Sequence, residues 1–336
     1  MKLFVLFLIM MVVIGAGVWV LAIDMPGKTS SGHFVPLTSE ETTLRDEVRR
    51  HVEKLAGEIG ERNLDHYEAL AAASRYLADT LASDGYRVER NGFEVTTPSG
   101  VLTTDNLVAE IRGSKRPGEI VVVGAHYDSA LGTPGADDNA TGAAAVLCLA
   151  KAFTGKTPER TLRFAFFTNE EPPYYHKAAM GSLVYARASK SRAESIVAML
   201  SLETIGYFSD QPGSQQYPFP INLLYPSTGN FLGFIGNVAS RALVRRAIGS
   251  FRAQSPVASE GVAGPTFIPG IDWSDQWAFW EQGYHGIMLT DTALYRNPHY
   301  HAPTDTPDTI DYERLVHVVR GVESVVADLA GIEAGR

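Results

Sequence analysis

Histidines and acids follow three separate apolar segments of the chain. The first segment leads into His126, and Asp138 follows after a glycine- and proline-rich loop. The segments 161–167 and 195–202 are followed by three further acids: Glu170, Glu171 and Glu203. One more histidine, His301, lies in a C-terminal loop. Imidazole and carboxylate groups in this combination can bind a metal ion, and together they favour zinc.

The supply of ligands fits two metal ions. Two ions about 3.5–4 Å apart need roughly two outer ligands each and one bridging carboxylate. The residues divide accordingly into one pair for each ion and one shared acid: His126 with Glu203, Glu171 with His301, and Asp138 between them. Glu170 is then left over beside a ligand, where a free carboxylate can act as the general base of a hydrolase.

Asp128 has a different predicted task. It lies two residues after His126, and from there its carboxylate can orient the imidazole without binding the metal. The alternative for this stretch alone is an ordinary strand, turn and helix start, with its acids in a solvated loop.

Strands must carry these residues to one place. Apolar runs predict buried strands at 120–126, 161–171, 195–208 and 285–291, and alternation predicts two more at 86–95 and 107–111. Helices are predicted at 40–60, 66–85, 140–153, 231–248, 274–283 (capped by Ser274) and from 311 onward. This alternation predicts an α/β fold, a three-layer sandwich with a largely parallel mixed central sheet flanked by helices. Such sheets place their sites at the carboxyl ends of the strands.

Composition limits the classes of partner. The chain has 336 residues, a net charge of -9 and no run rich in lysine and arginine, which argues against nucleic acid as a partner. Its single cysteine, Cys148, excludes an internal disulfide framework and is predicted to be a small core residue.

Five spaced motifs make a family resemblance visible. They are HYDS (126–129), PGADDNATG (134–142), NEE (169–171), LETIGYF (202–208) and YHAPTDT (300–306). With these motifs the chain resembles the co-catalytic zinc aminopeptidases of metallopeptidase family 28, which also contains glutamate carboxypeptidases and glutaminyl cyclases.

The resemblance implies a zinc exopeptidase fold with two Zn²⁺ ions per chain. It implies that Asp138 bridges the ions, that Glu170 is the general base and that Tyr300 polarises the scissile carbonyl. The expected reaction is hydrolysis of the N-terminal peptide bond of a peptide by water that the metals activate. We expect the substrate to carry a free N-terminus, because the motifs contain no arginine cluster to receive a C-terminal carboxylate.

Two departures from the family pattern stand out. Glu203 occupies a position that is more often aspartate, and it is one methylene longer. The segment 172–182 after Glu171 is longer than usual, so the wall of the site is expected to differ. Within this segment, His176 is predicted to be solvated rather than to line the pocket. Asp275 is assigned to the start of a helix rather than to a metal.

Other functions of the same fold stay open at this point. A glutaminyl cyclase-like enzyme with one zinc ion and a carboxypeptidase are two of them. The third, from a different class, is a catalytically silent, membrane-tethered binding module. The complete set of ligands and base argues against the silent module, and the intact His126 favours two ions.

The N-terminus predicts export. Residues 3–23 are all apolar or glycine, long enough to span a bilayer, so residues 1–23 are predicted to be a transmembrane anchor or a signal peptide. An anchor would hold the catalytic domain outside the cytoplasm, and cleavage would give a secreted or periplasmic enzyme. Residues 24–38 are predicted to be a linker and 39–336 the zinc peptidase domain.

Overall fold

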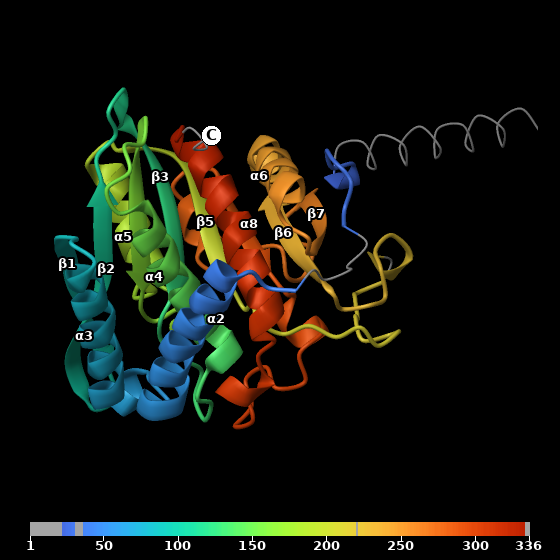
Figure 1. Ribbon diagram of the computed structural model, residues 1–336. Helices are drawn as coiled ribbons and strands as arrows, with labels where there is room; N and C mark the ends of the chain where they lie inside the picture. Colours follow the sequence, from blue (N-terminus) through green and yellow to red (C-terminus); the bar gives the residue numbers. More distant parts are fainter. Residues whose placement is uncertain (1–21, 31–35, 220, 333–336) are drawn as a thin grey trace, which may run out of the picture.

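A mixed sheet of eight strands forms the centre of the described part of the molecule (Figure 1). The computed structural model describes residues 22–30, 36–219 and 221–332. The strands are β1 Val88–Thr97, β2 Gly100–Ile111, β3 Arg116–His126, β4 Arg160–Phe167, β5 Ser195–Glu203, β6 Phe231–Asn237, β7 Ala258–Gly264 and β8 Gly286–Thr290, in the order β1-β2-β4-β3-β5-β8-β6-β7. The four central strands β4, β3, β5 and β8 are parallel, whereas β1, β2 and β6 introduce antiparallel pairings.

Helices cover both faces of this sheet. They are α2 Ser39–Val52, α3 Tyr67–Ser83, α4 Gly142–Phe153, α5 Gly181–Ser191, α6 Arg241–Gln254, α7 Gln276–Trp280 and α8 Tyr312–Ala330. The larger core lies under α2, α3, α4, α6 and α8, and the smaller one under α5 and α7. Strand β3 feeds both cores, since Val121 and Val123 point to one and Ile120 and Val122 to the other. This two-sided burial explains its unbroken apolar run and confirms the predicted three-layer α/β sandwich.

Close packing brings helix α4 against the carboxyl end of β5. A Cβ atom at Gly142, the first residue of α4, would lie only 2.4 Å from the carbonyl oxygen of Leu202. Only glycine fits there, because real Cβ atoms do not approach a carbonyl so closely. The contact holds the segment just before α4, which contains Asp138, beside the end of β5.

The prediction of one helix over 231–248 was wrong. Its first part is strand β6, its second part is helix α6, and strand β7 after it was not predicted. A short apolar run fits a buried strand and a buried helix equally well, so periodicity could not separate the two. Strand β7 was not predicted because its small residues are typical of a loop.

The predicted anchor or signal peptide lies almost entirely outside the described residues. Within the described ranges, the helices are too short or too polar to cross a bilayer. Residues 24–29 of the predicted linker lie against α6 and β7. Asp24 pairs with Arg245, and the backbone N–H of Ser259 donates to Oγ1 of Thr29 at 2.8 Å.

Candidate metal centre

Two neighbouring parallel strands end on predicted metal ligands. His126 is the last residue of β3 and Glu203 the last residue of β5. The strands pair in register as far as Gly124 and Ser201, so both side chains emerge at the same edge of the sheet. Nε2 of His126 lies 3.2 Å from Oε2 of Glu203. We call this pair the inner half of the centre.

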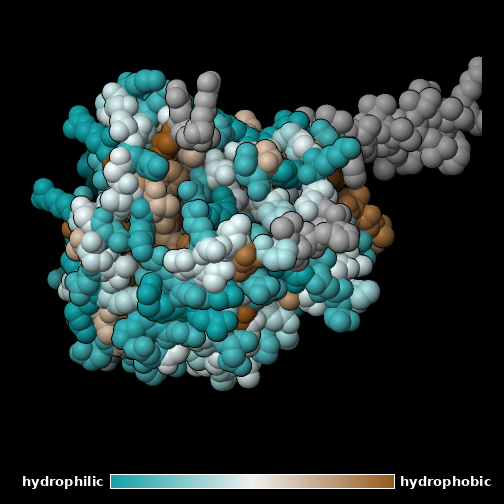
Figure 2. All heavy atoms as spheres, in the orientation of Figure 1, coloured by the Kyte–Doolittle hydropathy of each residue, from teal (hydrophilic) through white to brown (hydrophobic). Residues whose placement is uncertain are grey.

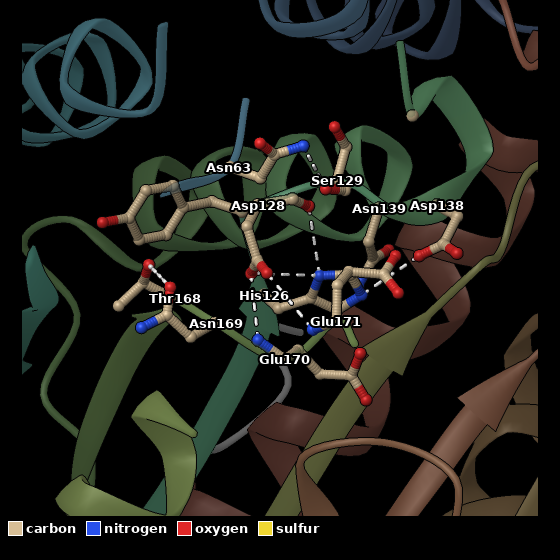
Figure 3. A network of polar contacts seen from close by, with 12 residues as sticks. Asn63, His126, Asp128, Ser129, Asp138, Asn139, Thr168, Asn169, Glu170 and Glu171 are labelled. Carbon is tan, nitrogen blue, oxygen red and sulfur yellow. Dashed lines mark hydrogen bonds and ion pairs between the residues drawn. The ribbon is translucent and has the colours of Figure 1, made fainter. Parts of the chain in front are cut away.

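A second pair comes from loops. Glu171 follows β4, and His301 lies in the loop before α8. Nε2 of His301 is 3.2 Å from Oε2 of Glu171. We call this pair the outer half. Figure 3 shows how Glu171, Asp138 and His126 converge at the end of the sheet.

Asp138 lies between the two halves and turns one oxygen toward each. Its Oδ1 is 3.1 Å from Nε2 of His126, and its Oδ2 is 3.0 Å from Nε2 of His301. A carboxylate in this position can bind two ions at once. The structure therefore brings together every residue that the sequence predicted to bind metal.

Unsatisfied buried atoms show that these residues fit a metal ion. Nε2 of His126, Oδ1 of Asp138 and Oε1 of Glu171 are buried without a hydrogen bond among the described residues. Burying polar atoms in this way costs free energy unless something binds them. One ligand atom from each of the three residues falls within 4.8 Å of the others. The nitrogen and oxygen donors, their spacing and their lack of partners all suit zinc.

The electrostatics of the cluster also call for cations. Burial, followed by the charge of Asp138, raises the pKa of Glu171 to about 8. Burial alone would lower the pKa of His301, but its contacts with Asp138 and Glu171 raise it to about 10. Asp138 responds the opposite way: burial would raise its pKa, but the two histidines outweigh burial and lower it. The acids outnumber the imidazoles in this buried space, and divalent ions would neutralise the excess charge.

Glu170 is close to the ligands but belongs to neither half. Its side chain is buried. Burial, and after it the charges of Glu203 and Glu171, raise the pKa of Glu170 despite the opposing influence of His126. A carboxylate with a raised pKa beside a metal site can accept and return a proton.

Asp128 connects the ligand strand to the glutamate pair. Its two carboxylate oxygens accept hydrogen bonds from the backbone N–H groups of Glu170 and Glu171, each at 3.2 Å. Nδ1 of His126 lies 3.2 Å from the carbonyl oxygen of Asp128 and 3.5 Å from its carboxylate. The Asp128 carboxylate thus positions the main chain of Glu170, the predicted base, and of Glu171, a predicted ligand of the outer half. It also makes the predicted contact with His126 of the inner half (Figure 3).

Tyr300 stacks on His301, one of the predicted ligands. Its ring lies 3.9 Å from the imidazole of His301, with 15° between the planes. Burial, and then the charges of Asp138 and Glu171, raise the pKa of the Tyr300 hydroxyl, which stays protonated and can donate a hydrogen bond. His301 itself has a φ of 54°, a left-handed conformation that is uncommon for a residue with a side chain.

Three positioning residues were not predicted from the sequence. The carboxylate of Asp305 accepts hydrogen bonds from the backbone N–H groups of Asp137 and Asp138 at 2.9 and 3.2 Å. The side chain of Asn139 donates to the carbonyl of Leu202 at 2.8 Å. The third residue, Arg62, comes from the segment between α2 and α3. Asn139 and Asp305 lie inside the motifs PGADDNATG and YHAPTDT, whereas Arg62 lies outside all five motifs.

Arg62 is fully buried behind the centre. Its guanidinium donates to the carbonyl oxygens of Tyr127, Pro134 and Gly135, and so supports the loop between His126 and Asp138. Burial lowers its pKa to about 10, and the surrounding acids, Asp128 foremost, oppose that shift. The arginine remains charged at neutral pH, but its N–H groups donate hydrogen bonds to main-chain carbonyl oxygens.

Two minor predictions were wrong. Ser274 does not cap α7, because its hydroxyl instead donates to Oε2 of Glu203 at 2.7 Å. His176 is not simply solvated: its imidazole lies between the rings of Tyr175 and Trp277, at 3.9 and 3.8 Å. Asp275 lies at the start of α7, as predicted, and occupies the N-cap position, but its buried side chain makes no capping hydrogen bond.

The fold and the cluster define a class, the metal-dependent hydrolases of the α/β type. The model of Peptidase family M28 matches residues 106–326. The chain belongs to this family, which confirms the predicted resemblance, the enzyme class of metallo-aminopeptidase type and zinc as its metal.

Individual relatives agree with this assignment. The chain is 35% identical over 286 residues to the uncharacterized protein YfbL of Escherichia coli, covering 82% of this chain and 86% of that protein. It is 27% identical to a probable aminopeptidase of Saccharomyces cerevisiae, covering 68% of this chain and 58% of the relative. Two other curated relatives, probable zinc metalloproteases of fungi, are longer still, and the chain spans 37% and 49% of them.

Solved structures share the fold at low sequence identity. The zinc aminopeptidase BSAP from Bacillus subtilis superposes with a TM-score of 0.67 at 14% identity, covering 87% of this chain and 96% of that chain. A glutaminyl cyclase from Fimbriiglobus ruber superposes with a TM-score of 0.62 at 18% identity, covering 90% and 99%. These similarities confirm the fold, and the two enzymes show that it serves more than one reaction.

Proposed function

We propose that the protein is a dinuclear zinc aminopeptidase that hydrolyses the N-terminal peptide bond of peptides. The observation that carries the proposal is the position of Asp138. Its two oxygens face different histidines, and each histidine has its own glutamate. A second complete half of this kind supports two ions rather than one.

The residues of the chain divide the catalytic work. The inner half (His126 and Glu203) would hold one zinc ion, the outer half (His301 and Glu171) the other, and Asp138 would bridge them. When bound, the zinc ions would activate water and polarise the scissile carbonyl. Glu170 would take a proton from the attacking water and deliver it to the leaving amine.

Tyr300 completes the proposed set. Its protonated hydroxyl would donate a hydrogen bond to the carbonyl oxygen as negative charge develops there. Asp128 would hold Glu170 at its position through the main chain. In this arrangement Glu170 is assigned to proton transfer, because Asp138, Glu171 and Glu203 would bind metal and Asp128 accepts hydrogen bonds from the main chain.

Charge supports the choice of the N-terminal end of the substrate. The centre collects acids, and a protonated amine complements its edge better than a carboxylate does. Four cationic side chains lie near the motifs in the sequence. Arg192 pairs with Glu194, Arg296 donates to Gln215, and Arg187 and Lys177 are exposed. The buried Arg62 donates its hydrogen bonds to main-chain carbonyl oxygens.

One peptide in four forms tests the proposal. Each end is either free or blocked, and the released residue is followed by mass spectrometry with zinc-loaded enzyme. We expect release of the N-terminal residue from both forms with a free N-terminus, and little release from acetylated peptides. Release of C-terminal residues would assign a carboxypeptidase, and cyclisation of an N-terminal glutamine without hydrolysis would assign a glutaminyl cyclase.

We further propose that the enzyme is exported. The apolar residues 3–23 support a membrane anchor with the catalytic domain outside the cytoplasm, or a signal peptide if the segment is cleaved. Mass determination of the N-terminus of the protein isolated from membranes and from the culture medium separates the two possibilities.

A further inference from the structure

The loop that follows the LETIGYF motif exposes an apolar tip. The side chains of Phe219, Leu223 and Leu224 are 82%, 71% and 43% exposed, and we call these three residues the apolar tip. Residues 211–228 around them contain no charged side chain. A single exposed leucine is ordinary, but three large apolar side chains on one uncharged loop mark an interaction surface.

The base of this loop is held in place by two tyrosines. The rings of Tyr217 and Tyr225 lie 5.9 Å apart, and the hydroxyl of Tyr217 donates to the carbonyl of Pro226 at 3.0 Å. The hydroxyl of Tyr225 donates to the carbonyl of Gly261 in β7 at 2.8 Å. The loop is thereby fixed to the edge strand of the sheet. Tyrosines at the base of an apolar projection match their preference for the boundary between lipid and water.

The start of the described chain meets the same glycine. A side chain at Gly261 would lie 2.9 Å from Cγ of Met25, so Met25 packs directly on that residue. Arg252 also fixes this segment, since its guanidinium donates to the carbonyl oxygens of Pro26 and Gly27 at 3.0 and 3.2 Å. The chain therefore enters the domain beside the base of the loop. In Figure 1 the loop is drawn in yellow next to the blue segment, and Figure 2 shows hydrophobic side chains on this side of the molecule.

We propose that the apolar tip inserts into the interface of a lipid bilayer. The argument for this occupant is the sequence that precedes Met25: residues 3–23 are uniformly apolar and long enough to span a bilayer. A chain that leaves the membrane there and is fixed at Gly261 brings the uncharged loop to the lipid surface. The anchor and the loop would then be two points of attachment, and together they would set the orientation of the domain.

The test uses the full-length chain in vesicles of phosphatidylcholine and phosphatidylglycerol. A nitroxide label is attached to Leu223→Cys, and the native Cys148 does not compete because it is buried. The matched control is Val101→Cys, an apolar position that is 60% exposed on β2, near the opposite edge of the sheet. We expect the label at 223 to collide with a water-soluble nickel chelate several-fold less than the label at 101, and to collide more with oxygen, which concentrates in lipid.

Two results would overturn the proposal. Equal collision with the nickel chelate at both positions would show that the tip stays in water. Protection at 223 from nickel and oxygen alike would show that protein covers the tip, as in a second copy of this chain.

A variant with Leu223→Asp and Leu224→Asp provides a second test with a label at Phe219→Cys. It should raise nickel collision at 219 to the level of the control and leave peptide hydrolysis in detergent unchanged, and unchanged nickel protection would contradict insertion.

Discussion

The inner and outer halves of the metal centre use the same kinds of ligand but differ in how they are held. His126 and Glu203 end two paired strands, and their side chains are 0% and 10% exposed. His301 comes from a loop, its side chain is 33% exposed, and its backbone is left-handed. Paired strands in the middle of a sheet hold their ends rigidly, whereas an exposed loop can move at lower cost. The two halves have the same kinds of ligand, but the inner ligands are held by paired strands and His301 by a loop. We therefore expect the two zinc ions to bind with unequal affinity.

Removing the shared acid, Asp138, should prevent both halves from binding zinc. Asp138→Ala is expected to lose both ions at stoichiometric zinc and all measurable hydrolysis, because neither half keeps three ligands. Elemental analysis after gel filtration measures the zinc content. The control is the neighbouring Asp137→Asn, whose side chain accepts from Gly206 and Asn297 and contacts no predicted ligand, and which should keep both ions. One ion retained in Asp138→Ala would show that the carboxylate does not bridge.

Substitutions of the two adjacent glutamates should affect different properties, the turnover rate in one case and zinc binding in the other. Glu170→Gln is expected to keep both zinc ions and lower kcat by roughly a hundred- to ten-thousandfold, because the amide cannot accept the proton. Glu171→Gln should instead release the outer ion. Zinc content and kcat measured on both variants give the comparison, and a loss below about tenfold in Glu170→Gln would remove that residue as the base.

The two halves themselves can be separated by titration. Zinc added to the metal-free protein should bind in two steps, with the inner half filled first. His301→Ala should remove only the weaker step, whereas His126→Ala should remove the tighter one. Isothermal titration resolves the steps. If His301→Ala removes the tighter step, support by paired strands does not decide affinity in this centre.

The smallest effect is expected at Ser274. Its hydroxyl is 2.7 Å from Oε2 of Glu203, and it restrains a ligand that is one methylene longer than the aspartate usual in the family. Ser274→Ala should weaken the inner ion by roughly the tenfold at the low end of such supporting contacts, and leave the outer ion unchanged. Ser274→Thr can keep the hydroxyl and serves as the control. Equal weakening of both ions would indicate a general loosening of the fold instead.

The wrong prediction of a single helix over 231–248 shows where the sequence pattern could not distinguish a strand from a helix. Residues 231–236 are apolar or glycine and show no period, and only their place beside β8 identifies them as part of a strand. In contrast, the apolar residues before His126 and Glu203 were correctly assigned, since glycine and polar residues bound them and buried parallel strands require such runs.

The sequence alone determined the family, the α/β fold and the residue types available for metal binding, because motif residues and apolar runs are local and can be read in order. Tertiary structure decided which side chains meet. Arg62 lies 65 positions from its acceptor Tyr127, Asp305 lies 168 positions from Asp137, and Ser274 lies 71 positions from Glu203. No local pattern predicts such pairs. Each arises because long connections fold back onto one edge of the sheet, where a buried polar group must find a partner or destabilise the fold.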